Sequence, residues 1–133
     1  MTGPHDRLAS EFFAALGSGD VPDHLLTDDM SGWTSNGTLD KATFQGAMKF
    51  YASVFADGPV YTIDSLTAEE DRVAAEVRSS GTLVNGEPFN NTHVYILRIR
   101  DGRVAHMAEH MNQLVVRDQI VPLMQAAMAK GAG

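Results

Sequence analysis

Four charged or titratable side chains in the second half of the sequence could together move a proton. Glu76 and Arg78 stand two positions apart, and His93 and Glu109 follow in the next two β-prone runs. A carboxylate or an imidazole can act as a general base near neutral pH, and a guanidinium can stabilise negative charge that develops on a substrate oxygen. The hypothesis is that Glu109 or His93 is the base and Arg78 is the stabilising cation.

Strand alternation decides which of these side chains share a face. Successive side chains of a strand point to opposite faces, so Glu76 and Arg78 lie on the same one. The same rule groups His93 and Glu109 with further residues of their own strands: Asn91 and Tyr95 with the first, Met107 and Met111 with the second. Periodicity alone leaves open which faces point into the fold.

The charged set also has a simpler interpretation. Two glutamates around one arginine form an ordinary cross-strand ion-pair cluster in many sheets. If the set faces an enclosed volume instead, its charges must be paired, and Arg78 should then bridge Glu76 or Glu109. The remaining carboxylate and His93 could then have perturbed pKa values suited to moving a proton.

The run from His106 to His110 has the H-x-x-E-H spacing of zinc peptidases. That chemistry requires both histidines on one helix face, whereas this run follows a hairpin turn and is strand-like, so Glu109 points away from both. We expect no metal site here. The two histidines are more simply polar residues of the outer face and could lie at a dimer interface.

Apolar spacing predicts the helices that must position these strands. Leu8, Phe12 and Leu16 recur at helical spacing before Gly17, and Asp40 is a suitable N-cap for an amphipathic run. The predicted helices span about 4–16, 41–56 and 118–130, with a short helical piece at 23–26.

The remaining chain has the alternation and the turns of a β-meander. Asn85-Gly86 and Asp101-Gly102 are turn sequences between long β-prone runs. The predicted strands span 60–66, 73–84, 89–100 and 104–116, with a short additional strand at 30–34 that carries Trp33.

This order of elements indicates an α+β fold in a single domain, 1–133. Two long helices come before the four-strand meander rather than between its strands, which favours helices packed on one face of a bent antiparallel sheet. Strands this long must twist and curl into a cone. We expect a small-molecule pocket on the concave side, where the helices close it.

Composition narrows the possible partners. The formal net charge of -7 repels phosphate backbones and anionic lipid headgroups, so we expect neither nucleic acid nor a membrane surface as a partner. The chain has no cysteine, which excludes disulfides and thiolate ligands. Without a recognisable secretory signal or membrane-spanning run, the expected location is the cytoplasm.

The second half of the chain resembles a known family. It is similar to the C-terminal meander of SnoaL-like polyketide cyclases, within the NTF2-like superfamily that also holds ketosteroid isomerases. The resemblance rests on the runs Gly86-Glu87-Pro88-Phe89-Asn90-Asn91, His93-Val94-Tyr95, Asp101-Gly102-Arg103-Val104 and Glu109-His110-Met111-Asn112, where Asn112 replaces a second acid. Earlier matches are Phe12-Phe13-Ala14-Ala15-Leu16, Gly19-Asp20, Trp33 and Gly37, so that the similarity covers approximately residues 8 to 113.

The chain departs from two catalytic sets of that fold. Limonene-epoxide hydrolases use an Arg-x-Asp pair on one strand, and their Arg and first Asp fall on Glu76 and Arg78, with the charges inverted. Their last Asp falls on Glu109. Ketosteroid isomerases need a tyrosine on the first helix, where this chain has Phe12 and Phe13.

The resemblance implies which residues face the cavity. It assigns the catalytic set Glu76, Arg78, His93 and Glu109 to the pocket, together with Asn91 and Tyr95. Four further residues could line the pocket, although such positions are also typical of plain core packing: Trp33, Tyr51, Met107 and Met111.

The function that the resemblance implies is cofactor-free acid–base chemistry. The expected reaction is an isomerisation, cyclisation, dehydration or hydrolysis of a small hydrophobic oxygenated molecule, with no metal or other cofactor. The alternative is a non-catalytic domain of the same fold that binds a small ligand or serves dimerisation. We also expect a homodimer that forms through the outer sheet face.

Overall fold

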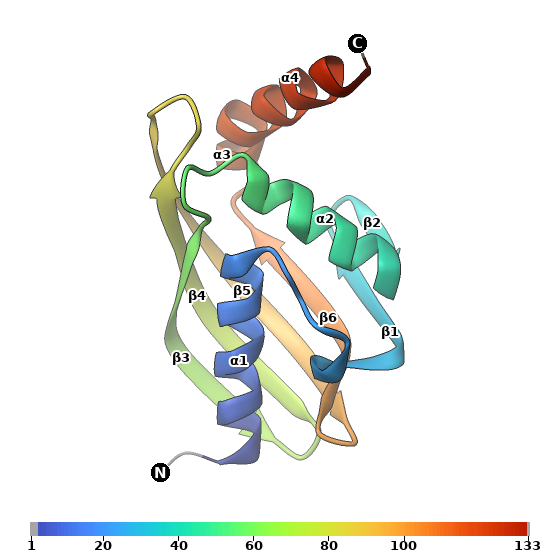
Figure 1. The fold of residues 1–133 in the computed structure, drawn as a ribbon. Coiled ribbons are helices and arrows are strands. Elements are labelled where there is room, and N and C mark those ends of the chain that lie inside the picture. The colour runs from blue at the N-terminus through green and yellow to red at the C-terminus, as the bar shows by residue number, and fades with distance from the viewer. Residues whose placement is uncertain (1–2, 133) are drawn as a thin grey trace.

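The computed structural model describes residues 3–132 and shows helices packed on the concave face of a curved six-stranded sheet (Figure 1). The strand order is β2-β1-β6-β5-β4-β3. The strands are β1 (Leu26–Thr34), β2 (Gly37–Asp40), β3 (Val60–Glu69), β4 (Arg72–Thr82), β5 (Pro88–Arg100) and β6 (Arg103–Met111). This confirms the predicted α+β fold and the predicted meander of β3 to β6. The last predicted strand, 104–116, is too long, because β6 ends at Met111 and residues 113–116 belong to the C-terminal helix.

The sheet differs from the prediction at one edge. It is mixed rather than wholly antiparallel, because β1 pairs with β6 in parallel. The short strand β2, which folds back on β1, was not predicted. Its four residues, Gly37–Asp40, are too few and too polar to show an alternating pattern. The predicted strand at 30–34 is the second half of a longer β1.

The turns between the long strands follow the sequence. Asp101 and Gly102 both have positive φ, 55° and 71°, which is the type I′ geometry that joins twisted antiparallel strands. Gly86 also has a positive φ of 88° in the connection between β4 and β5. Both predicted turns are therefore confirmed.

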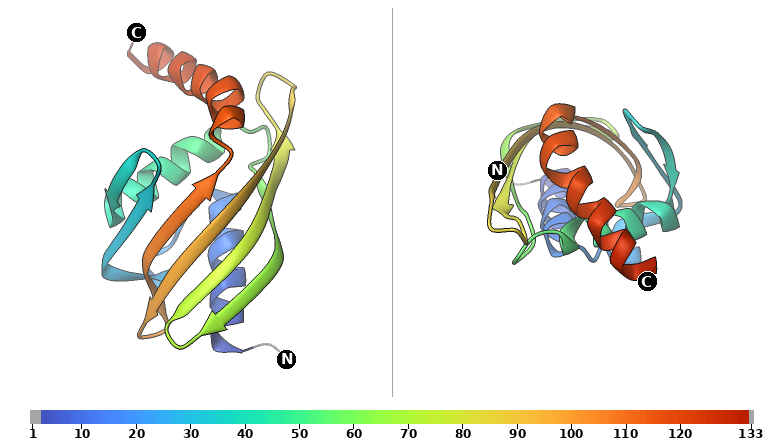
Figure 2. Two further views of the ribbon diagram at one scale, coloured as in Figure 1. Left: turned by 180° about the vertical axis from the view of Figure 1, so that it is seen from behind. Right: turned by 90° about the horizontal axis from the view of Figure 1, so that it is seen from above.

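Bulges help the sheet to curve around the helices. The pairing register of β3 with β4 shifts between Ile63 and Ser65, and that of β5 with β6 shifts at Arg98 and Ile99. An extra residue in one strand bends that strand and increases its twist. Seen from above, the strands wrap around α1, and from behind the convex face is turned to the viewer with α1 beyond it (Figure 2).

The helices form where the apolar spacing predicts them, and their apolar faces pack against the sheet. The first two are α1 (Pro4–Ser18) and α2 (Lys41–Ser53), and Asp40 caps α2 by accepting a hydrogen bond of 2.8 Å from the Thr43 N–H. The C-terminal helix consists of α3 (Gln113–Val115), a π-helical turn (Val116–Ile120) and α4 (Val121–Ala132). The predicted short helical piece is a 3₁₀ turn, Asp23–Leu25.

The core lies between α1 and the concave face of the sheet. Phe12, Phe13 and Leu16 of α1 are all buried, and the Phe13 ring lies 4.9 Å from the ring of Tyr95 on β5. Phe13 also contacts Tyr61 of β3, so this packing holds α1 against β3 and β5 and leaves the space under α2 less filled. Within the described residues, no helix is both long and apolar enough to cross a membrane.

Candidate active site

A cavity of ≈ 240 Å³ lies between α2 and the concave face of the sheet. Apolar side chains form most of its wall: Leu39, Phe44, Ala47, Met48, Met107, Met111 and Met124. Four methionines among these give the wall an adaptable shape, because the thioether side chain is flexible and polarisable. The predicted pocket-lining residues Met107 and Met111 thus lie at the cavity wall.

Three polar side chains of the cavity wall lie near Glu109 of β6: Tyr51 of α2, Tyr61 of β3 and His93 of β5. Thr34 and Asn36 also line the cavity. Three of these residues, Tyr51, His93 and Glu109, were predicted to face the pocket. Glu109 is the one carboxylate among the lining residues, and no lysine or arginine is among them.

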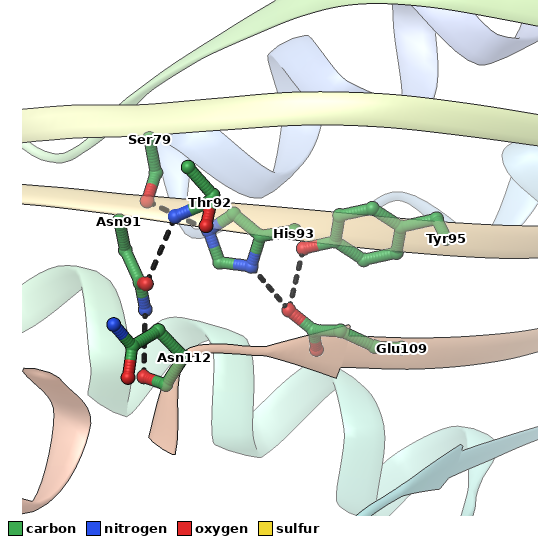
Figure 3. A network of polar contacts seen from close by, with 7 residues as sticks. All are labelled: Ser79, Asn91, Thr92, His93, Tyr95, Glu109 and Asn112. Atoms are coloured by element: carbon green, nitrogen blue, oxygen red, sulfur yellow. Dashed lines mark hydrogen bonds and ion pairs between the residues drawn. The ribbon is translucent and has the colours of Figure 1, made fainter. Parts of the chain in front are cut away.

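Glu109 is held by two hydrogen bonds to the same carboxylate oxygen (Figure 3). The Tyr95 hydroxyl donates to Oε2 over 2.7 Å, and Nδ1 of His93 lies 2.9 Å from Oε2. On the far side of the imidazole, Nε2 of His93 lies 2.7 Å from Oγ of Ser79. All four side chains are buried, so the network has a fixed geometry.

The second carboxylate oxygen of Glu109 is different. Oε1 has no hydrogen-bond partner among the described residues. It is also not one of the fully buried polar atoms that lack a partner, so part of its surface is accessible. It is therefore exposed to the cavity that Glu109 lines. Both ring nitrogens of His93 are occupied, which leaves Oε1 as the accessible proton acceptor in this part of the cavity.

Two tyrosines present hydroxyl groups near this carboxylate. Burial, together with the negative charge of Glu109, raises the pKa of Tyr51. Burial also raises the pKa of Tyr61, with smaller contributions from Tyr51 and Glu109. Both hydroxyls thus remain protonated at neutral pH and can donate hydrogen bonds. Sequence reasoning missed Tyr61, although alternation along its strand could have placed it beside Ser79, its cross-strand partner.

Glu76 and Arg78 do not line the cavity that Glu109 lines, contrary to the prediction. They line a separate pocket on the convex face, to which Asp64 and His110 also belong. There, Arg78 binds Asp64 through Nε at 2.8 Å and Ser65 donates a 2.6 Å hydrogen bond to Glu76. The guanidinium holds the pKa of Asp64 below its usual range. Arg78 bridges neither glutamate.

The reason lies in the other face of the same strand. Val73, Ala75 and Val77 are almost fully buried and supply the concave side of β4, so Glu76 and Arg78 must point outward. Val77 is the cross-strand partner of His93, which puts those two residues on the same side. The apolar set 73, 75 and 77 was the signal for the correct orientation.

Trp33 is also outside the cavity. It belongs to the convex face, where its ring lies 5.0 Å from that of His110. Its neighbours Thr34 and Asn36 line the cavity instead. His106 is likewise on the convex side, with Nδ1 2.7 Å from Oγ of Ser31, so β6 directs both histidines away from Glu109.

Two further predicted residues lie beside the cavity. Tyr95 is fully buried beneath it and acts on it through its hydrogen bond to Glu109. Asn91 borders a second, separate cavity, also lined by Ser79, and its Nδ2 donates a 3.4 Å hydrogen bond to the backbone oxygen of Asn112. Among residues 3–132, no three His, Cys, Asp or Glu side chains are grouped as a metal would require.

Comparison with known sequences identifies one family. Residues 9–107 match the SnoaL-like domain family. No curated protein matches the chain.

Comparison with solved structures finds the same fold. AclR, a putative hydroxylase from Streptomyces galilaeus, is 23% identical with a TM-score of 0.75, over 88% of this chain and 85% of AclR. IdmH, a putative polyketide cyclase from Streptomyces antibioticus, is 21% identical with a TM-score of 0.73, over 88% of this chain and 97% of IdmH. An NTF2-like protein from Anabaena variabilis is 20% identical with a TM-score of 0.72, over 82% of this chain and 87% of that protein. These likenesses show that the fold is NTF2-like.

Proposed function

We propose that this chain, which belongs to the SnoaL-like domain family, is a cofactor-free acid–base enzyme whose general base is Glu109. The observation that carries the proposal is the position of Glu109 Oε1, an unpaired carboxylate oxygen at the wall of a mostly apolar cavity. A base in such a place can remove a proton from a bound molecule without competition from bulk water.

The neighbours of Glu109 have complementary roles in this proposal. His93 and Tyr95 hold Oε2 and so aim Oε1 at the cavity, which makes both of them positioning residues. The Tyr51 and Tyr61 hydroxyls donate hydrogen bonds to the oxygen on which negative charge develops. They take the role that Arg78 was expected to fill.

The cavity also favours a particular kind of substrate. Because a carboxylate faces it and no cationic side chain lines it, it disfavours carboxylates and phosphates. A cavity of about 150 Å³ holds one benzene ring, so ≈ 240 Å³ suits a neutral molecule of one or two rings. Removal of a proton beside a carbonyl is the step that isomerisation, cyclisation and dehydration share. The similarity to a putative polyketide cyclase supports this substrate class.

Deuterium exchange tests the proposal without knowledge of the natural reaction. The protein is mixed in D₂O with a panel of neutral one- and two-ring ketones, and NMR follows the loss of hydrogen beside the carbonyl. At least one ketone should exchange faster with the protein than without it. Glu109→Gln, which keeps the shape of the side chain, should reduce that rate by roughly 10²- to 10⁴-fold.

His110→Gln is the matched control, because His110 follows Glu109 on β6 but lies on the convex face. It should exchange the ketone at the wild-type rate. Equal activity of Glu109→Gln and wild type would disprove the base assignment. Saturable binding of the ketones with no exchange at all would instead identify a ligand-binding domain without catalysis.

We further propose that the chain forms a homodimer through the convex sheet face. Val94 is 43% exposed in the middle of that face, and the rings of Trp33 and His110 contact each other beside it in a tilted arrangement. Exposed apolar groups on a sheet are typical of subunit contacts. Val94→Lys should lower the sedimentation coefficient to that of a monomer, whereas Val84→Lys, in the loop after β4, should not. A wild-type monomer at all concentrations would contradict the dimer.

A further inference from the structure

Ser79 and His93 form a buried hydrogen-bonded chain that ends on Glu109 (Figure 3). Oγ of Ser79 lies 2.7 Å from Nε2 of His93, and Nδ1 of His93 lies 2.9 Å from Oε2 of Glu109. The exposed fractions of Ser79 and His93 are only 1% and 4%. A proton can move along both links without any rearrangement of heavy atoms, because both distances are those of good hydrogen bonds.

The hydrogen atoms of this chain all point towards Glu109. A carboxylate oxygen only accepts, so the proton of the neutral imidazole is on Nδ1 of His93. Nε2 is then an acceptor, and the hydroxyl of Ser79 donates to it. The chain is thus already polarised for delivery of a proton to the carboxylate.

The two ends of the chain border different cavities. Glu109 lines the cavity under α2, whereas Ser79 lines a second cavity of ≈ 200 Å³ where the paired strands β4 and β5 meet Asn112 and Val115. Its lining includes the polar residues Ser80, Asn90, Asn91, Thr92 and Asn112, the charged Arg78 and the apolar Val115. Polar groups of this kind can hold water.

We propose that Ser79 and His93 relay protons between Glu109 and the second cavity. This inference rests on the proposed role of Glu109 as a base. A ligand that fills the first cavity shuts bulk water away from Glu109, so the carboxylate needs another route by which to exchange its proton with solvent.

The proton transfers of the relay need no reactant other than solvent. For delivery, the Nδ1–H bond of His93 breaks as an O–H bond forms at Oε2 of Glu109. The O–H bond of Ser79 breaks as Nε2–H forms, and a hydronium ion in the second cavity gives a proton to Oγ of Ser79 and becomes water. Delivery leaves the Nε2–H tautomer, in which Glu109 can give its proton to a substrate and later take another. The reverse sequence then runs from that tautomer: the O–H bond at Oε2 breaks as Nδ1–H forms, Nε2–H breaks as an O–H bond forms at Oγ of Ser79, and Ser79 gives a proton to water, which restores the starting tautomer.

The surroundings of His93 suit such a relay. Besides Glu109, the rings of Tyr95 and Tyr61 lie near the imidazole, with ring centroids 5.5 and 5.7 Å away, and Tyr51 lines the same cavity. Burial raises the pKa of all three hydroxyls, so these tyrosines stay uncharged at neutral pH.

Hydrogen exchange of the His93 ring N–H tests the relay without any substrate. In ¹⁵N-labelled protein, assigned with His93→Gln, the ring proton should be on Nδ1. Its exchange with solvent should slow by about tenfold or more in Ser79→Ala, since the hydroxyl that passes protons is gone. Ser79→Thr, which retains a hydroxyl, should restore much of the rate. Ser80→Ala changes the wall of the same cavity without touching His93, so it should leave the rate unchanged.

Ketone exchange then links the relay to turnover. Ser79→Ala should lower kcat roughly 10- to 100-fold with KM unchanged, because Ser79 does not line the substrate cavity. An Nε2–H tautomer in the wild type, or ring exchange in Ser79→Ala as fast as in the wild type, would overturn the relay. If ring exchange slows but no ketone reacts, the relay stands and the proposed base function fails.

Discussion

Tyr95 and Glu109 are direct cross-strand partners on β5 and β6, and the Tyr95 hydroxyl donates a 2.7 Å hydrogen bond to Oε2 of Glu109. The tyrosine is fully buried between α1 and the sheet, so the core packing also fixes the orientation of the carboxylate. Sheet register and core packing together thus set the direction of the proposed base.

Removal of that hydroxyl should affect both stability and activity. In Tyr95→Phe the ring packing remains but Oε2 loses one of its two partners, which should cost about 1.5–3 kcal/mol of unfolding free energy. Ketone exchange should fall as well, because Oε1 is less well aimed. Urea unfolding and the exchange assay measure the two effects.

Tyr61→Phe is the informative comparison for that variant. The Tyr61 hydroxyl lies at the cavity with Glu109, and it interacts with the hydroxyl of Tyr95 rather than with the carboxylate. Its loss should therefore reduce exchange activity and cost less unfolding free energy than Tyr95→Phe does. Equal stability losses in the two variants would contradict this division of roles.

A larger side chain on α2 should block the cavity. Ala47 is an exposed residue on the face of α2 that lines the cavity, so the larger side chain in Ala47→Phe should obstruct it. Binding of a ketone that the wild type accepts should weaken at least tenfold, which corresponds to about 1.4 kcal/mol. Calorimetric titration measures this, with Ala42→Phe as the control, since Ala42 is exposed on the same helix but does not line the cavity.

The convex-face charges should be dispensable for catalysis. Glu76→Gln and Arg78→Ala remove groups that contact Ser65 and Asp64 rather than the cavity. Both variants should exchange ketones as the wild type does, and Arg78→Ala should unfold at almost the same urea concentration, because an exposed ion pair contributes little. A loss of exchange comparable to that of Glu109→Gln would restore Arg78 to the site.

High pH should destabilise the fold through its tyrosines. All three tyrosines have a pKa raised by burial above the ordinary value of 10.0. Above about pH 10 the unfolded chain therefore releases tyrosine protons that the folded chain keeps. The unfolding free energy, fully present below that pH, should decline as the pH rises further.

Urea unfolding from about pH 8 to about pH 11 measures the decline, and the ultraviolet absorbance of tyrosinate should appear only together with unfolding. Tyrosinate absorbance near pH 10 in protein that remains folded would contradict the enclosed positions of these side chains.

Much of the fold could be predicted from local patterns. The stripe of Leu8, Phe12 and Leu16, the N-cap Asp40 and the turn Asp101-Gly102 each act within a few residues, so the sequence carried enough information to place α1, α2 and the β5–β6 hairpin. Strand β2 and the parallel pairing of β1 escaped prediction, because they depend on contacts between distant parts of the chain.

The site was likewise predictable within single strands but not between them. Alternation correctly put His93 with Tyr95, and Glu109 with Met107, each pair on one face of its own strand. Alternation could not by itself decide which face of β4 lies on the same side of the sheet as His93 and Glu109. The predicted cluster of these residues with Glu76 and Arg78 therefore does not form. The cross-strand register settles that question, and it is a property of two paired strands rather than of one strand's sequence.

By itself, then, the sequence determined an α+β chain with alternating strands and a small set of candidate acids and bases. Only the tertiary structure decided that Glu109 is aimed at the cavity and that Arg78 faces outward. The physical reason is that burial of Val73, Ala75 and Val77 against the helices sets the orientation of β4, while Ser79 and His93 meet only when β4 and β5 pair in this register.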